Sequence, residues 1–310
     1  MADPGGQDEQ DRGRLRIRVR LFAVQRELAG TREVPLDLPA GATIEDGWAA
    51  LVARFPILAP GRPSVRFARN GEYAEPTEAL VDGDELACIP PVSGGADSAD
   101  EAYPADTAGA AGSTSATGRA SVTGPPSATR PASATDADRP IRILELWAEP
   151  FPAALAEDLS ARLATAADGA IVVFVGRTRE SPGTPAPGQE AEAARHAGRT
   201  VDALEYEAHE PMALAILAQI ADEIAERFAV VRLAIVHRTG VVPLGEASVL
   251  VVAASPHRDA AFAAARHAID ETKARTPIWK AERFRDGHVW IGAPARTASS
   301  PRPASGEQGG

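Results

Sequence analysis

The feature that most constrains this sequence is a low-complexity stretch near its middle. Residues 96–139 are mainly Ala, Ser, Thr, Pro, Gly and Asp, and their only large apolar side chains are Tyr103 and Val122. Such a stretch cannot bury enough surface to offset the entropy lost on ordering it. The sequence therefore divides into five segments. These are a disordered N-terminal segment (1–14), a first folded domain (15–95), a disordered linker (96–139), a second folded domain (140–292) and a disordered tail (293–310).

Charge and cysteine content exclude several classes of protein. Lys+Arg number 32 against 43 Asp+Glu, a net charge of −11, whereas general nucleic-acid binding needs clustered cations. Cys88 is the only cysteine, which excludes an intrachain disulfide, a CxxC redox pair and a cysteine-rich zinc site. No apolar run reaches the roughly 18 residues of a membrane span, and the polar first residues do not resemble a signal peptide. We therefore expect a cytoplasmic protein that binds neither nucleic acid nor membranes.

Alternating apolar residues predict paired strands at the start of the first domain. Residues 15–21 and 33–38 alternate, and they could form a hairpin around Gly30. Thr43 is expected to cap a helix that ends before Pro56. Two more strands, 65–69 and 85–89, follow this helix, and an Asn-Gly turn comes after the first of them. Strands, a helix and further strands in this order describe a β-grasp.

The second domain mixes strands and helices irregularly, which predicts an α+β fold. Residues 181–198 are expected to form a flexible loop within it. Strands are expected at 141–147, 170–175, 201–206, 231–237 and 248–253, and helices at 153–166, 211–228 and 256–275.

The last residues of the first domain suggest a reactive chain end. Residues 90–95 read PPVSGG, immediately before the linker. Two prolines stiffen the exit from the last strand, and two glycines without side chains can enter a narrow channel and approach a reacting atom closely. The alternative is that this segment merely starts the linker.

The start of the helix at 256–275 is a candidate anion site. Ser255 is expected as its N-cap and Pro256 as its first residue. His257 and Arg258 then lie in the first turn, where free backbone N–H groups can bind an anion such as phosphate.

Two lysines flank the far end of this helix. Lys273 lies in its last turn, and Pro277 ends it because proline lacks an N–H group. Lys280 then falls on an extended segment, on the side opposite Trp279 and Ala281. The two lysines could converge on one pocket, although the helix dipole alone also favours a lysine at a helix C-terminus.

Two sets of short motifs point to one family. In the first domain they are NGE (70–72), DGDE (82–85) and IPPVSGG (89–95). In the second they are FVGRTR (174–179), LEYEA (204–208), HRTG (237–240), LGE (244–246), SPHR (255–258), DETK (270–273) and PIWK (277–280). With these motifs, residues 15–95 resemble the small, ubiquitin-like sulfur-carrier subunit of molybdopterin synthase, and residues 141–292 resemble its large, catalytic subunit.

The resemblance implies an activity and a fold. The second domain would have the hammerhead-type α/β fold of the large subunit and would form a homodimer. The chain would transfer sulfur from a thiocarboxylate on Gly95 to cyclic pyranopterin monophosphate, which forms the molybdopterin dithiolene in molybdenum cofactor biosynthesis. No tightly bound cofactor and no metal are implied.

The resemblance also assigns residues to roles. Lys273 and Lys280 match the catalytic lysines of the family, with Lys273 as the principal acid, base or transient covalent partner. Arg179 matches a basic residue of the family's pocket. With His257 and Arg258, it would hold phosphate and pterin oxygens.

One feature departs from the family pattern. Gly95 is amide-bonded to Ala96 here, so it has no free carboxylate to activate. We expect a processing protease to cleave behind Gly95, after which an ATP-dependent activating enzyme and a sulfur donor would charge the new end. The alternative is that a separate carrier serves the catalytic domain, with the β-grasp domain acting as a regulatory plug or as a ubiquitin-like protein modifier.

Four other polar residues have simpler interpretations. Cys88 is expected to pack as a small hydrophobic residue, and His237 to orient its neighbours rather than react. Glu205 and Glu207 lie two apart on one strand face, where paired carboxylates are usually solvated.

Overall fold

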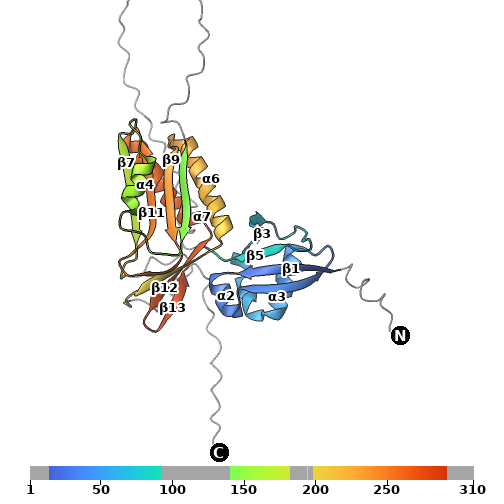
Figure 1. Ribbon diagram of the computed structural model, residues 1–310. Coiled ribbons are helices and arrows are strands. Elements are labelled where there is room, and N and C mark those ends of the chain that lie inside the picture. Colours follow the sequence, from blue (N-terminus) through green and yellow to red (C-terminus); the bar gives the residue numbers. More distant parts are fainter. Residues whose placement is uncertain (1–13, 93–139, 182–193, 195–197, 292–310) are drawn as a thin grey trace, which may run out of the picture.

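The computed structural model describes residues 14–92, 140–181, 194 and 198–291, which form two lobes that contact each other (Figure 1). The N-terminal lobe is residues 14–92 and the C-terminal lobe is residues 140–291. Gly95 and the expected linker lie outside the described residues. So do most of segments 1–14, 181–198 and 293–310, which were expected to be disordered. No described helix is long and apolar enough to cross a membrane.

The N-terminal lobe is the predicted β-grasp. Its five strands lie in the order β2-β1-β5-β3-β4, with β1 antiparallel to β2 and parallel to β5. Helix α3 packs on this sheet, where Ile17, Trp48 and Leu86 share one buried cluster. The elements are β1 (Arg14–Leu21), α2 (Ala23–Ala29), β2 (Glu33–Pro39), α3 (Ile44–Arg54), the 3-10 helix η1 (Pro56–Ser64), β3 (Arg66–Arg69), β4 (Glu72–Ala74) and β5 (Glu85–Ile89).

In this lobe the cap of α3 agrees with the prediction, whereas the connection between β1 and β2 does not. The N-cap of α3 is Thr43, whose side chain accepts from the Asp46 N–H while the Asp46 carboxylate accepts from the Thr43 N–H. Strands β1 and β2 pair as predicted, but helix α2 fills the connection that we expected to be a hairpin turn. Gly30 ends this helix with φ of 70°, a left-handed conformation that glycine adopts at no steric cost.

The C-terminal lobe is built on two four-stranded sheets, β6-β9-β11-β7 and β10-β8-β12-β13. Helix α4 covers one face of the first sheet, and helices α6 and α7 cover the other. The predicted α+β class is confirmed. The elements are β6 (Ile141–Trp147), α4 (Leu155–Leu163), β7 (Ala170–Arg177), β8 (Ala203–Ala208), α6 (Glu210–Phe228), β9 (Arg232–Arg238), β10 (Gly240–Pro243), β11 (Ala247–Ser255), α7 (Arg258–Arg275), β12 (Ile278–Phe284) and β13 (Gly287–Ile291).

The start of α7 differs from the prediction. Ser255 is the last residue of β11, His257 is the N-cap and Arg258 is the first helical residue. The expected Ser255 cap was therefore wrong, because β11 continues to pair with β7 up to Ser255, which lies opposite Ala170. Strands β10 and β13 were not predicted.

Candidate functional site

A cavity of about 300 Å³ lies in the C-terminal lobe where α7 meets β8, β9, β11 and β12. This volume is at the lower end of the usual range for small-molecule sites, about 300–1,000 Å³. The residues that line it are Gly176, Arg177, Arg179, Ser181, Val201, Leu204, Tyr206, His237, Ser248, Val249, Ile269, Thr272, Lys273, Ile278, Lys280 and Glu282.

Lys273 and Lys280 both line this cavity, so the structure brings the two lysines together as predicted. Lys273 lies in the last turn of α7, and Lys280 is the third residue of β12. Because side chains alternate along a strand, Trp279 and Ala281 face away from the cavity and belong to a buried cluster on the opposite side. Arg179 also lines the cavity.

Burial and neighbouring charges make Lys280 easier to deprotonate. Burial lowers the pKa of Lys280, and the nearby charges of Lys273 and Arg179 lower it further. Glu282, whose Oε1 lies 3.8 Å from the Lys280 Nζ, acts in the opposite direction. An amine whose charged form is disfavoured releases its proton more readily, as a general acid or base must.

Three uncharged side chains, those of Tyr206, His237 and Ser248, form a neutral wall of the same cavity. Burial lowers the pKa of His237 to about 4, and the charge of Lys273 lowers it further, so the ring is neutral at physiological pH. Its Nδ1 lies 2.8 Å from the Arg238 carbonyl oxygen. Because a carbonyl only accepts, Nδ1 carries the proton and Nε2 is left as an acceptor. The Tyr206 ring packs edge-on against His237 at 4.8 Å, and its hydroxyl lies 3.2 Å from the Ser248 Oγ.

Sequence reasoning missed this neutral wall. Tyr206 and Ser248 come from separate strands, β8 and β11, and only the folded sheet order places them together. His237 was predicted to orient its neighbours. Its fixed ring agrees with that interpretation, and the position of the ring in the cavity wall adds a contact with whatever binds there.

His257 and Arg258 are not among the described residues that line this cavity. They lie at the N-terminal end of α7, whereas Lys273 lies near its C-terminal end. The helix has 18 residues and is therefore about 27 Å long at 1.5 Å per residue. Within one chain, the structure does not bring these two residues to the lysines.

The end of the N-terminal lobe docks directly behind Lys280. The Trp279 Nε1 donates a hydrogen bond of 3.0 Å to the Pro90 carbonyl oxygen, and Pro90 starts the segment that leads to Gly95. Phe22 stacks on the Trp279 ring at 4.8 Å between centroids and lies 5.3 Å from the His209 ring. Apolar residues of both lobes form one buried cluster around this contact.

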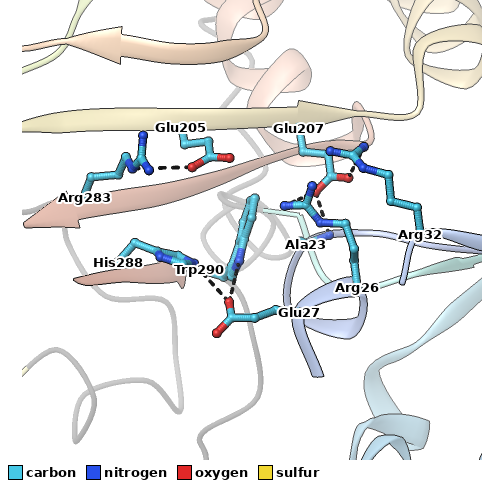
Figure 2. Close-up of polar contacts among 9 residues, drawn as sticks. All are labelled: Ala23, Arg26, Glu27, Arg32, Glu205, Glu207, Arg283, His288 and Trp290. Carbon is cyan, nitrogen blue, oxygen red and sulfur yellow. Dashed lines mark hydrogen bonds and ion pairs between the residues drawn. The ribbon is translucent and has the colours of Figure 1, made fainter. Parts of the chain in front are cut away.

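Glu207 is buried between the lobes, so its predicted solvated role was wrong. Its Oε2 accepts from the Ala23 N–H at 3.0 Å and pairs with Arg26 at 3.4 Å, and its Oε1 pairs with Arg32 at 3.2 Å. Figure 2 shows these three groups of the N-terminal lobe converging on the one carboxylate. Ala23 has φ of 48°, an unfavourable conformation for a residue with a Cβ, and this conformation occurs where its N–H meets Glu207.

A second carboxylate reinforces the same interface from the other side. The Glu27 Oε2, on α2, accepts from the Trp290 Nε1 at 3.1 Å and lies 3.0 Å from the His288 Nε2 (Figure 2). Each lobe thus supplies one carboxylate that is held by donors from the other lobe.

Replacing Glu207 with alanine is expected to weaken docking of the lobes by about 2–5 kcal/mol, because buried donors lose their acceptor. Amide hydrogen exchange along α2 of the full chain measures this as lost protection. Glu205 is the matched control, since it lies two residues away on β8 and pairs across 3.6 Å with Arg283 of its own lobe (Figure 2). Its replacement with alanine is expected to change protection by no more than about 1 kcal/mol. Equal effects of the two substitutions would contradict the assignment.

The deprotonated form of Cys88 is disfavoured, as expected for a buried thiol. Cys88 is fully buried in the core of the N-terminal lobe, and this burial raises the pKa of its thiol. The prediction that it packs as a small hydrophobic residue is confirmed.

Two different protein-family models match separate parts of the chain. Residues 19–95 match the model of the ThiS family, and residues 148–275 match the model of the MoaE protein family. The molybdopterin synthase catalytic subunit of Bacillus subtilis is 42% identical over 133 residues, 43% of this chain and 76% of the relative. That of Oryza sativa subsp. indica is 43% identical over 148 residues, 45% of this chain and 69% of the relative.

Solved structures are also similar to part of the chain. A crystal structure of molybdopterin synthase from Staphylococcus aureus is 36% identical and covers 47% of this chain and 94% of that chain, with a TM-score of 0.40.

Proposed function

The chain belongs to the molybdopterin synthase catalytic subunit family, and from this premise we propose the reaction that its two lobes perform together. The chain joins a ThiS-family domain to this catalytic domain, so it is a fused molybdopterin synthase, an enzyme of molybdenum cofactor biosynthesis. We propose that it acts as a sulfurtransferase whose N-terminal lobe carries the sulfur. The observation that carries this proposal is the contact of Pro90 with Trp279, the residue next to Lys280.

In the proposed reaction the carrier end enters the cavity. A thiocarboxylate on Gly95, made by an ATP-dependent activating enzyme and a sulfur donor, delivers sulfur to cyclic pyranopterin monophosphate. The five residues from Pro91 to Gly95 span at most about 17 Å when extended. This reach supports delivery, because Pro90 is hydrogen-bonded to Trp279, which precedes Lys280 on β12 and faces the opposite side of that strand from the cavity. Two rounds of transfer then build the dithiolene.

The cavity residues divide between binding and proton transfer. Arg179 holds phosphate or pterin oxygens. Lys273 is the principal acid, base or transient covalent partner, and Lys280 assists it, since the lowered pKa of Lys280 eases proton exchange. The experiment that tests the proposal incubates protein cut behind Gly95 with the pyranopterin monophosphate and a sulfur-charging system, followed by an assay for the dithiolene. Absence of dithiolene from correctly charged protein would refute the reaction.

We further propose that the catalytic lobe forms a homodimer in which His257 and Arg258 serve the cavity of the neighbouring copy. An apolar surface surrounds their end of α7. Phe262, one turn after Arg258, is 62% exposed, and Ile171 near the start of the edge strand β7 is 41% exposed. β7 begins beside the residues that precede α7. A second copy covering this surface would bury these residues and bring His257 and Arg258 to a cavity that they do not line within one chain.

Mixed dimers test this arrangement. We expect Lys273→Ala and Arg258→Ala homodimers each to lose most activity, because every cavity then lacks one group. In an equal co-refolded mixture about half of the dimers are mixed, and each mixed two-fold dimer has one of its two cavities with both groups intact. Such a mixture should therefore recover roughly a quarter of the wild-type activity. Recovery is measured as dithiolene formed per chain. A mixture as inactive as its two components would show that each cavity uses His257 and Arg258 of its own chain.

A further inference from the structure

Two buried hydroxyl groups near the end of α7 have no hydrogen-bond partner among the described residues. They are the Oγ1 atoms of Thr272 and Thr276, whose residues are 3% and 1% exposed. Most buried polar side-chain atoms in proteins are hydrogen-bonded, so each exception requires an explanation. A hydroxyl without a partner costs folding free energy, because it has lost its hydrogen bonds to water.

The surroundings of the two hydroxyls differ in one decisive respect. Thr272 is one of the residues that line the cavity, whereas Thr276, four residues further on, is not among the described residues of that lining. Thr272 lies beside Lys273 and one helical turn after Ile269, which also lines the cavity. Ile269, Thr272 and Lys273 therefore share the face of α7 that borders the cavity.

The chemistry around Thr272 indicates which part of a ligand it meets. The cations of the cavity suit the phosphate of the substrate. The lining also contains apolar side chains, among them Ile269, Ile278 and Val249. A flat heterocycle packs well against such a surface, and a hydroxyl is an uncharged group that can both donate and accept. It therefore matches an uncharged N–H or carbonyl group at the edge of the ring system.

We propose that the Thr272 hydroxyl hydrogen-bonds the edge of the pterin ring system and so helps the cavity select a pterin phosphate over other phosphate esters. This inference rests on the proposed function, because it takes the pyranopterin as the ligand. A buried polar group that is satisfied only by the correct ligand penalises analogues that lack the matching atom. Thr272 is thus a specificity-determining residue for binding.

The test replaces Thr272 with valine, which has nearly the same shape and no hydroxyl. Binding of pyranopterin monophosphate to the uncut full chain is measured by titration calorimetry, and KM is measured with the cut and charged chain. We expect both Kd and KM to rise about 3- to 10-fold. Thr272→Ser, which restores the hydroxyl, should return both to within about 2-fold of the wild type. The thermal midpoint of Thr272→Val should equal or exceed that of the wild type, because a buried group without a partner has been removed.

Thr276→Val is the matched control, because it removes the other buried hydroxyl without touching the cavity. It should leave Kd and KM unchanged while affecting the thermal midpoint in the same direction. Wild-type affinity in Thr272→Val, or an equal loss of affinity in Thr276→Val, would overturn the inference. The calorimetric readout needs no sulfur transfer. A wild-type chain that binds the pterin but forms no dithiolene would therefore contradict the proposed function and leave the result for Thr272 valid.

Discussion

Replacing Lys273 with alanine should lower dithiolene formation by at least about 100-fold, the lower end of the range for losing a group that transfers protons. Lys273 lies in the cavity with Lys280 and Arg179, so the substitution removes a reacting group and leaves the other cations in place. The rate is measured with protein cut behind Gly95 and charged with sulfur. Docking of the two lobes should persist, because Glu207 and Trp279 hold the N-terminal lobe and neither depends on Lys273.

Two measurements separate this result from a structural defect. Amide exchange along α2 should match that of the wild type, which shows that the lobes remain docked. Lys273→Arg keeps the positive charge but cannot release a proton in a protein, so it should be nearly as inactive as Lys273→Ala if proton transfer or covalent attachment is the role. Activity retained by Lys273→Arg would assign Lys273 to charge stabilisation alone. Full activity in Lys273→Ala would remove it from the reaction altogether.

The sequence predicted those parts of the fold that local signals determine. Thr43 followed three residues later by Asp46 indicates a helix start, and the structure contains this capping box. Helix α2 was missed because its seven residues begin at Ala23 with a positive φ. Glu207 of the other lobe accepts the Ala23 N–H, so the conformation depends on a residue far away in the sequence. The Ser255 cap was wrong for a similar reason, since sheet pairing extends β11 up to this residue.

The sequence predicted the part of the site that depends on the turn between α7 and β12. Pro277 ends α7, and the alternation that follows places Lys280 on the side away from Trp279, as the sequence indicated. Glu207 was misread because a carboxylate on a strand face is solvated unless something covers it, and its cover is the other lobe. Thr272 carries no local signal either, because only the folded structure shows that its hydroxyl has no partner among the described residues.

The intact chain should form no dithiolene, whereas the chain cut behind Gly95 should be active. The physical reason is the amide bond to Ala96. An amide carbonyl carbon is bonded to nitrogen and offers no carboxylate oxygen for activation by ATP, so no thiocarboxylate can form on it. Intact-mass analysis of protein isolated from its own cells should therefore find two fragments, and the N-terminal fragment should end at Gly95. After charging, its mass should rise by the difference between sulfur and oxygen.

The position of the cut provides the matched control. A chain cut one residue later, behind Ala96, also has a free carboxylate, but its reacting carbon is displaced by about 3.5 Å and its last residue carries a methyl group. Misplacement on this scale should lower the rate by at least about 100-fold relative to the cut behind Gly95. Equal rates for the chains cut behind Gly95 and behind Ala96 would show that the cavity does not recognise the diglycine end.

Two further outcomes decide which carrier serves the cavity. Dithiolene from a single uncut species with no added carrier would contradict cleavage. A cut and charged chain that forms no dithiolene until a separately made carrier is added would contradict delivery by its own N-terminal lobe. It would instead make that lobe a plug, held over Trp279 by Pro90 and over Glu207 by α2. The hydrogen bond between Trp279 and Pro90 predicts the first lobe as donor, because it holds the end of that lobe against β12, the strand that carries Lys280.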